Sequence, residues 1–237
     1  MVAPCKSRFC LVIFDNDGVV VDSEPIASRA MSATLTSLGF AVLPDDCDQW
    51  LKGGTLERTR QLVEVRFGRR LPGDFEARYT AALKVAVTGQ LRPVAGVAQV
   101  LDQLRAAAVP YCLASSGRRE RVRFTLEAAG MAGRFGDQWW GAEDVPLGRG
   151  KPSPDIFLVA AQAMGVAPAC CAVVEDSDLG VQAAKAAGMT ALGFAARTPA
   201  GKLSAADAVF TDMAELPALI FASAPRGAGS AASGTVG

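Results

Sequence analysis

The sequence contains no histidine. This absence excludes Ser-His-Asp and Cys-His catalysis and every metal site that depends on histidine ligands. Any chemistry must therefore use carboxylates, lysine, serine, threonine or cysteine. None of the six cysteines forms a Cys-x-x-Cys pair, so zinc binding and thioredoxin chemistry are not expected. We expect Cys10, Cys112, Cys170 and Cys171 to be core residues, because they lie in or beside apolar runs.

An excess of charge and long apolar runs are also absent. The 24 lysines and arginines balance 24 aspartates and glutamates, so the chain has no electrostatic footprint for nucleic acid or an anionic membrane. No apolar run approaches the roughly 18 residues of a membrane span. The run that follows Arg8 has about half the minimum length of a secretory h-region. We therefore expect a cytoplasmic protein without nucleic-acid or membrane partners. We also expect a monomer or a weak homodimer.

The most informative stretch begins with an apolar run at residues 10–14, which is typical of a strand buried on both faces. Asp15 and Asp17 follow this strand directly. Because side chains alternate along a strand, the two aspartates should point to one side and Asn16 to the other. Gly18 can take a conformation closed to other residues and turn the chain. Ligands bind at this end of the strands in open α/β sheets, although a pair of loop aspartates can also simply cap the next helix.

Two kinds of pattern divide the chain. Residues 25–90 show helical punctuation and no convincing buried strand. From residue 91 onward helices and short apolar strands alternate, which predicts a parallel sheet with covering helices. We therefore predict an α/β core formed by residues 1–23 and 91–222, a helical cap domain at residues 24–90 and a disordered tail at residues 223–237.

Three of the predicted strands end in polar side chains, namely Asp15 with Asp17, Ser115 with Ser116, and Glu175 with Asp176. A parallel sheet brings these strand ends together at one edge. Four carboxylates in one cleft would repel one another and raise their pKa values. A hard divalent cation relieves this repulsion, and Mg²⁺ takes oxygen ligands while retaining waters and a substrate phosphate.

Two further features suit a phosphate group. The turn Ser115-Ser116-Gly117 offers a hydroxyl and backbone N–H groups ahead of a helix. Lys151 lies in a proline-stiffened segment, and its ammonium can neutralise both the carboxylates and an anionic substrate. In the mechanism that these parts predict, Asp15 attacks phosphorus and forms an aspartyl-phosphate. Asp17 then protonates the leaving alcohol and deprotonates the hydrolytic water, while Mg²⁺, Lys151 and Ser115 stabilise the transferred group.

Four ordered motifs resemble those of the haloacid dehalogenase (HAD) superfamily: FDNDGV at residues 14–19, ASSG at 114–117, GKPSPD at 150–155 and VEDSDLG at 174–180. The resemblance implies a Rossmann-like core with a central first strand and a mobile helical cap of the C1 type. It also implies Mg²⁺ held by the carboxylates of Asp15 and Asp176 and the backbone carbonyl of Asp17, with Glu175 close by.

Within the superfamily the chain resembles the β-phosphoglucomutase-like and phosphatase subgroup, because WLKGGTLE at residues 50–57 matches the cap loop found there. Ala27 stands where the sugar phosphomutases carry a histidine, and Leu56 where they carry an arginine for the second phosphate. Both departures favour simple hydrolysis. We expect a Mg²⁺-dependent phosphatase that acts on a small phosphorylated metabolite, such as a sugar or sugar-acid phosphate.

We assign Ser116, Gly117, Lys52 and Glu24 to substrate binding, although Lys52 is equally compatible with a solvated loop lysine. The basic cluster at residues 118–123 is interpreted as a solvated helix face. A phosphonate hydrolase of the superfamily would need a Schiff-base lysine in the cap, and we expect neither cap lysine to lie close to Glu24. Two alternatives stay open, a sugar phosphomutase and a non-catalytic phospholigand-binding protein.

Overall fold

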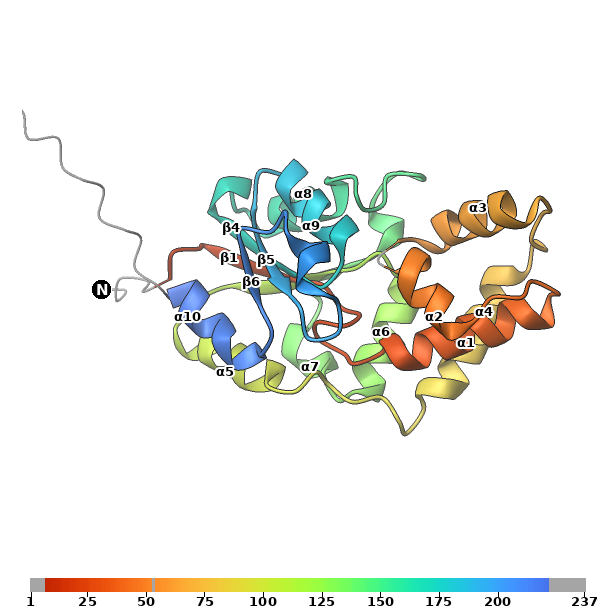
Figure 1. Ribbon diagram of the computed structural model, residues 1–237. Helices are drawn as coiled ribbons and strands as arrows, with labels where there is room; N and C mark the ends of the chain where they lie inside the picture. Colours follow the sequence, from red (N-terminus) through yellow and green to blue (C-terminus); the bar gives the residue numbers. More distant parts are fainter. Residues whose placement is uncertain (1–6, 53, 222–237) are drawn as a thin grey trace, which may run out of the picture.

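The computed structural model describes residues 7–52 and 54–221, and its centre is a parallel sheet (Figure 1). The strand order is β3-β2-β1-β4-β5-β6. The strands are β1 Leu11–Phe14, β2 Tyr111–Ala114, β3 Trp139–Trp140, β4 Cys171–Glu175, β5 Thr190–Phe194 and β6 Ala208–Phe210. Ile13 of β1 is in register with Cys112 of β2 and Val173 of β4, so β1 lies between these two strands. The carboxyl ends of β1, β2 and β4 therefore meet at one edge, and the predicted α/β fold is confirmed.

Helices cover both faces of the sheet, which explains why β1 is a continuous apolar run. Val12 and Phe14 belong to a cluster that includes buried residues of helices α5 Val97–Ala106, α6 Arg119–Ala128, α7 Ala132–Phe135 and α10 Leu216–Phe221. Leu11 and Ile13 point to the opposite face and pack with α8 Asp155–Ala163 and α9 Asp178–Ala186. Short 3₁₀ turns occur at Ala142–Asp144, Pro168–Cys170, Ala200–Leu203 and Met213–Glu215.

A second group of helices lies beyond the sheet, on the right of Figure 1. It consists of α1 Glu24–Ser37, α2 Pro44–Asp46, a π-helical turn Cys47–Leu51, α3 Leu56–Phe67 and α4 Phe75–Val87. Helices α1 and α4 pack against each other, and Leu35, Phe40, Phe75 and Leu83 are buried among them. The described residues from 25 to 90 contain no strand, as predicted. We propose that residues 24–90 form the cap domain.

The four cysteines that were expected in the core differ in burial. Cys112 and Cys171 are buried, but Cys10 is exposed and Cys170 is half-buried. The core prediction was wrong for Cys10, because β1 begins one residue later and Cys10 lies outside the sheet. The tail predicted at residues 223–237 lies outside the described residues.

Candidate active site

The end of β1 directs consecutive side chains to opposite sides. Asp15 and Asp17 line the same pocket, as the alternation predicts. Asn16 turns the other way, and its Nδ2 donates to Thr125 Oγ1 at 3.1 Å. The backbone then turns at Gly18, whose φ is 82°. A Cβ on Gly18 would collide with the carboxylate of Asp176, so only glycine lets the two segments approach.

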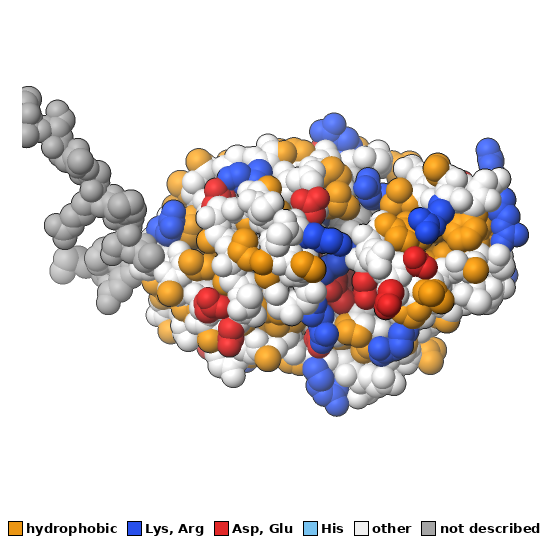
Figure 2. All heavy atoms as spheres, viewed as in Figure 1, with side chains coloured by type: hydrophobic (Ala, Val, Ile, Leu, Met, Phe, Trp, Pro, Cys, Tyr) orange, Lys and Arg blue, Asp and Glu red, His pale blue; other side chains and the backbone are white. Residues whose placement is uncertain are grey.

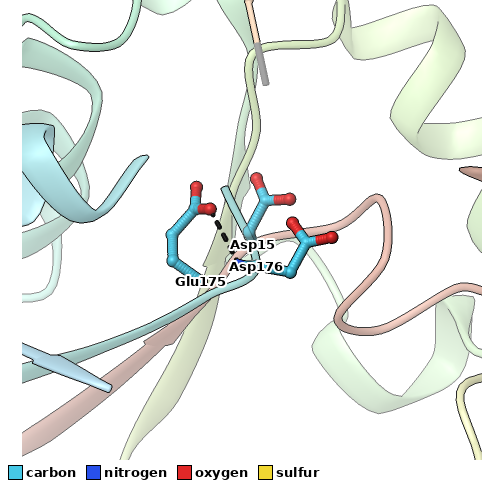
Figure 3. Close-up of side chains that lie close together, drawn as sticks. All are labelled: Asp15, Glu175 and Asp176. Atoms are coloured by element: carbon cyan, nitrogen blue, oxygen red, sulfur yellow. Dashed lines mark hydrogen bonds between the residues drawn. The ribbon is translucent and has the colours of Figure 1, made fainter. Parts of the chain in front are cut away.

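The ends of β1 and β4 bring three carboxylates together (Figure 3). One oxygen from each of Asp15, Glu175 and Asp176 lies within 4.8 Å of the others, and all three residues are buried. A buried group of carboxylate oxygens is the donor set that a hard divalent cation prefers. The residues present therefore fit the divalent metal ion that the sequence predicts at this edge of the sheet.

Lys151 supplies positive charge inside this acidic group and is only 3% exposed. Its Nζ lies 2.6 Å from Asp15 Oδ1 and also pairs with Glu175 Oε1. The other oxygen of Glu175 accepts hydrogen bonds from the backbone N–H of Asp176 and from the N–H and hydroxyl of Ser177, at 2.9–3.0 Å. Glu175 therefore orients Lys151 and the loop after β4, and its assignment as a metal ligand stays a prediction.

The pKa values of the two aspartates that follow β1 are shifted in opposite directions. It raises the pKa of Asp15 well above the usual value, because Lys151 only partly offsets desolvation and the neighbouring carboxylates Glu175 and Asp176. Burial also raises the pKa of Asp17, but Arg121 and the hydrogen bond from Ser23 outweigh it, so that pKa is lowered. These shifts favour the carboxylate form of Asp17, so donation of a proton by Asp17 requires a nearby negative charge, such as a phosphoryl group, that raises its pKa.

Lys52 links the cap to the core. Its Nζ lies 2.7 Å from Glu24 Oε2 and 2.8 Å from Asp176 Oδ2, and it donates to Thr198 Oγ1 at 2.5 Å. The loop that carries Lys52 therefore contacts the core at the sheet edge, and Figure 2 shows acidic and basic side chains gathered near the middle of the molecule. Lys52 is not a solvated loop residue.

The expectation that no cap lysine lies near Glu24 was wrong, because the cap loop folds back onto the first turn of α1. This proximity does not favour a Schiff-base mechanism. Although burial lowers the pKa of Lys52, Asp176 and Glu24 outweigh burial and raise that pKa above its usual value. A Schiff base needs a neutral amine, whereas these ion pairs keep Lys52 protonated.

The turn after β2 completes the pocket. Ser115 is buried, and its Oγ accepts a hydrogen bond from the backbone N–H of Gly117 at 3.0 Å. The cavity measures about 110 Å³. With the exception of Glu175, every residue that the sequence assigns to the site lines it, namely Asp15, Asp17, Glu24, Lys52, Ser115, Ser116, Gly117, Lys151 and Asp176.

Residues 11–188 match the family model described as haloacid dehalogenase-like hydrolase. The chain belongs to this family. It is 31% identical over 216 residues to 6-phosphogluconate phosphatase of Escherichia coli strain K12. This match covers 90% of this chain and 95% of the relative. It is 30% identical over 196 residues to β-phosphoglucomutase of Bacillus subtilis strain 168, covering 77% and 81%.

A solved structure of a HAD family hydrolase from Deinococcus radiodurans R1, with bound phosphate and sodium, superimposes with a TM-score of 0.70. Its sequence is 32% identical, and the match covers 90% of this chain and 95% of that one. These relatives confirm the predicted superfamily and the predicted enzyme class, a phosphatase of the HAD hydrolases. No helix in the described part of the chain is long and apolar enough to cross a membrane.

The same pocket is also lined by residues that the sequence analysis did not assign to the site, namely Ser28, Asp48, Thr59, Tyr79 and Arg121. The interpretation of residues 118–123 as a solvated face was wrong for Arg121, whose Nη2 lies 3.0 Å from Asp17 Oδ1. Helical periodicity in the sequence could have identified Arg121 as a residue of the buried face. It precedes the buried Thr125 by four residues and so lies on the same face of α6.

Proposed function

We propose that this protein is a phosphatase that hydrolyses a small phosphorylated metabolite, such as a sugar or sugar-acid phosphate, through an aspartyl-phosphate on Asp15. The proposal depends above all on the contact of 2.6 Å between Asp15 and the buried Lys151, beside the carboxylate of Asp176. A nucleophile at this position has a cation next to it and further oxygen ligands within reach. The chain's similarity to 6-phosphogluconate phosphatase supports the same reaction class.

The carboxylates of Asp15 and Asp176 and the backbone carbonyl of Asp17 would hold Mg²⁺, with Glu175 close by. When bound, Mg²⁺ supplies positive charge that offsets the carboxylates and the phosphoryl oxygens. Lys151 and the turn Ser115-Ser116-Gly117 bind the same phosphoryl group through an ammonium, a hydroxyl and backbone N–H groups.

The reaction has two displacements at phosphorus. A carboxylate oxygen of Asp15 forms a bond to phosphorus while the bond to the leaving alcohol breaks, and Asp17 gives its proton to the leaving oxygen. Asp17, now a carboxylate, then takes a proton from water. The water oxygen attacks phosphorus, the bond to Asp15 breaks, and inorganic phosphate leaves with both aspartates restored.

The pocket favours hydrolysis over the phosphomutase alternative. Ala27 and Leu56, which replace the histidine and arginine of the mutases, both line it. Among the described lining residues, the cations are Lys52, Arg121 and Lys151, and each is already paired with a carboxylate. A bisphosphorylated intermediate would therefore find no spare cation for its second phosphate.

A panel of phosphate monoesters with Mg²⁺ tests the proposal, with released phosphate as the readout. We expect release by the wild-type protein and none by the variant Asp15→Asn, which removes the nucleophile. Mutase activity on a hexose 1-phosphate without phosphate release would instead establish the phosphomutase. Ligand binding with no turnover of any ester, unchanged in Asp15→Asn, would establish the binding protein.

A further inference from the structure

Arg121 reaches the reaction centre from outside the four HAD motifs. It belongs to helix α6, yet its Nη2 lies 3.0 Å from Asp17 Oδ1. The side chain of Arg121 is 18% exposed and that of Asp17 is 22% exposed. The same oxygen accepts a hydrogen bond from Ser23 Oγ at 2.5 Å. Asp17 is thus held from two directions, by the segment before α1 and by a helix of the core.

The guanidinium is itself fixed in place. Its central carbon lies 5.8 Å from the ring centroid of Tyr79, which is 2% exposed and belongs to cap helix α4. The Nε of Arg121 is buried and has no hydrogen-bond partner among the described residues. The guanidinium of Arg121 is therefore packed between helix α6 and the cap helix α4, beside the carboxylate of Asp17.

We propose that Arg121 is a positioning residue, which holds the carboxyl group of Asp17 where it exchanges a proton with the leaving oxygen. This inference depends on the proposed function, because it assigns proton transfer to Asp17. Catalytic groups must be held within about 0.5 Å of their productive position. Asp17 lies in a turn beyond the end of β1, and the ion pair to a packed helix supplies the rigidity that a turn lacks.

Substrates with different leaving groups distinguish a positioning role of Arg121 from a phosphate-binding or purely structural role. An alkyl alcohol must be protonated as it departs, so its release depends on a well-placed acid. The p-nitrophenolate ion is stable and departs without a proton. A residue that acts only through Asp17 should therefore matter for β-glycerophosphate and hardly matter for p-nitrophenyl phosphate.

The experiment measures kcat/KM of the Mg²⁺-loaded full chain with both esters, because this ratio covers the steps up to departure of the leaving group. For Arg121→Met we expect a fall of about 100-fold with β-glycerophosphate and less than about threefold with p-nitrophenyl phosphate. Arg121→Lys keeps the charge and should restore part of the loss. The matched control Arg123→Met, which alters an exposed arginine of the same helix, should leave both values unchanged.

A double-mutant cycle tests whether Arg121 acts through Asp17. Adding Arg121→Met to Asp17→Asn should cause no further loss with β-glycerophosphate, because the positioned group is already gone. Equal losses with both esters, or an additive loss in the double variant, would overturn the proposal in favour of a phosphate-binding or purely structural role. If the wild-type protein releases phosphate from neither these esters nor the panel, the proposed function itself fails, which is a separate outcome.

Discussion

Lys52 of the cap and Asp176 of the core form an ion pair in which Nζ lies 2.8 Å from Oδ2. The same ammonium lies 2.7 Å from Glu24. Asp176 is also a proposed metal ligand, so the cap lysine and a bound Mg²⁺ would share one carboxylate. Two cations around a single carboxylate repel each other, so a bound metal ion would couple to the position of the cap.

This coupling predicts that Lys52→Met strengthens metal binding. Removing the ammonium should lower the dissociation constant for Mg²⁺ about tenfold, which corresponds to about 1.4 kcal/mol. Isothermal titration calorimetry of the metal-free protein measures it directly. Lys84→Met is the control, because Lys84 is a half-exposed cap lysine that pairs with Glu120 away from the acidic group. An unchanged or weaker affinity in Lys52→Met would show that the two cations do not compete.

The cap loop makes a second close contact with the core, at Gly150. A Cβ on this glycine would lie 2.5 Å from Thr55 Cγ2, too close for two carbon atoms. Gly150→Ala should therefore displace the cap loop and lower kcat/KM by about tenfold or more, since misplacing a positioning group by about 1 Å can cost 100-fold. Adding Thr55→Ser removes the colliding methyl group but keeps the hydroxyl that caps α3. If this second change fails to restore kcat/KM, the steric explanation is wrong.

The core of the site was predictable because its determinants are local. The apolar run of β1 and the alternation after it place Asp15 and Asp17, and the run of β4 places Asp176 at the neighbouring strand end. Side chains that arrive from distant segments were not predictable in this way. Lys52 meets Thr198 across 146 positions of sequence, and only the packing of the cap against the core brings them together. Arg121 was missed because its charge was given more weight than its position on the buried face of α6.

Because Lys151 is buried, we expect its substitution to lower the free energy of unfolding strongly. Lys151→Met leaves Asp15 and Glu175 without their cation, and breaking a buried pair from one side costs about 3–5 kcal/mol. Urea denaturation of the metal-free protein measures this loss. The matched control is Lys185→Met, because the pair of Lys185 and Asp207 is exposed and such pairs contribute about 0–1 kcal/mol. Saturating Mg²⁺ should return part of the lost stability, since it binds only the folded site. Equal effects of the two substitutions would contradict the role given to Lys151.

The position of Asp48 at the pocket wall leads to a prediction about which phosphate esters the enzyme prefers. Its carboxylate lies at the pocket wall, where it accepts a hydrogen bond from the hydroxyl of Ser28. A carboxylate there accepts hydrogen bonds from substrate hydroxyls and repels a substrate carboxylate. Sorbitol 6-phosphate and 6-phosphogluconate form a matched pair, because they differ only in a hydroxymethyl group against a carboxylate.

Asp48→Asn should therefore raise kcat/KM for 6-phosphogluconate relative to sorbitol 6-phosphate. Asp48 is exposed, so solvent screening limits the expected change in the ratio to about fivefold, the equivalent of up to about 1 kcal/mol. Asp45→Asn is the control, since Asp45 is an exposed cap carboxylate that does not line the pocket. A parallel change with both esters would mean that Asp48 supports the shape of the pocket, whereas an unchanged ratio would place the far end of the substrate away from Asp48.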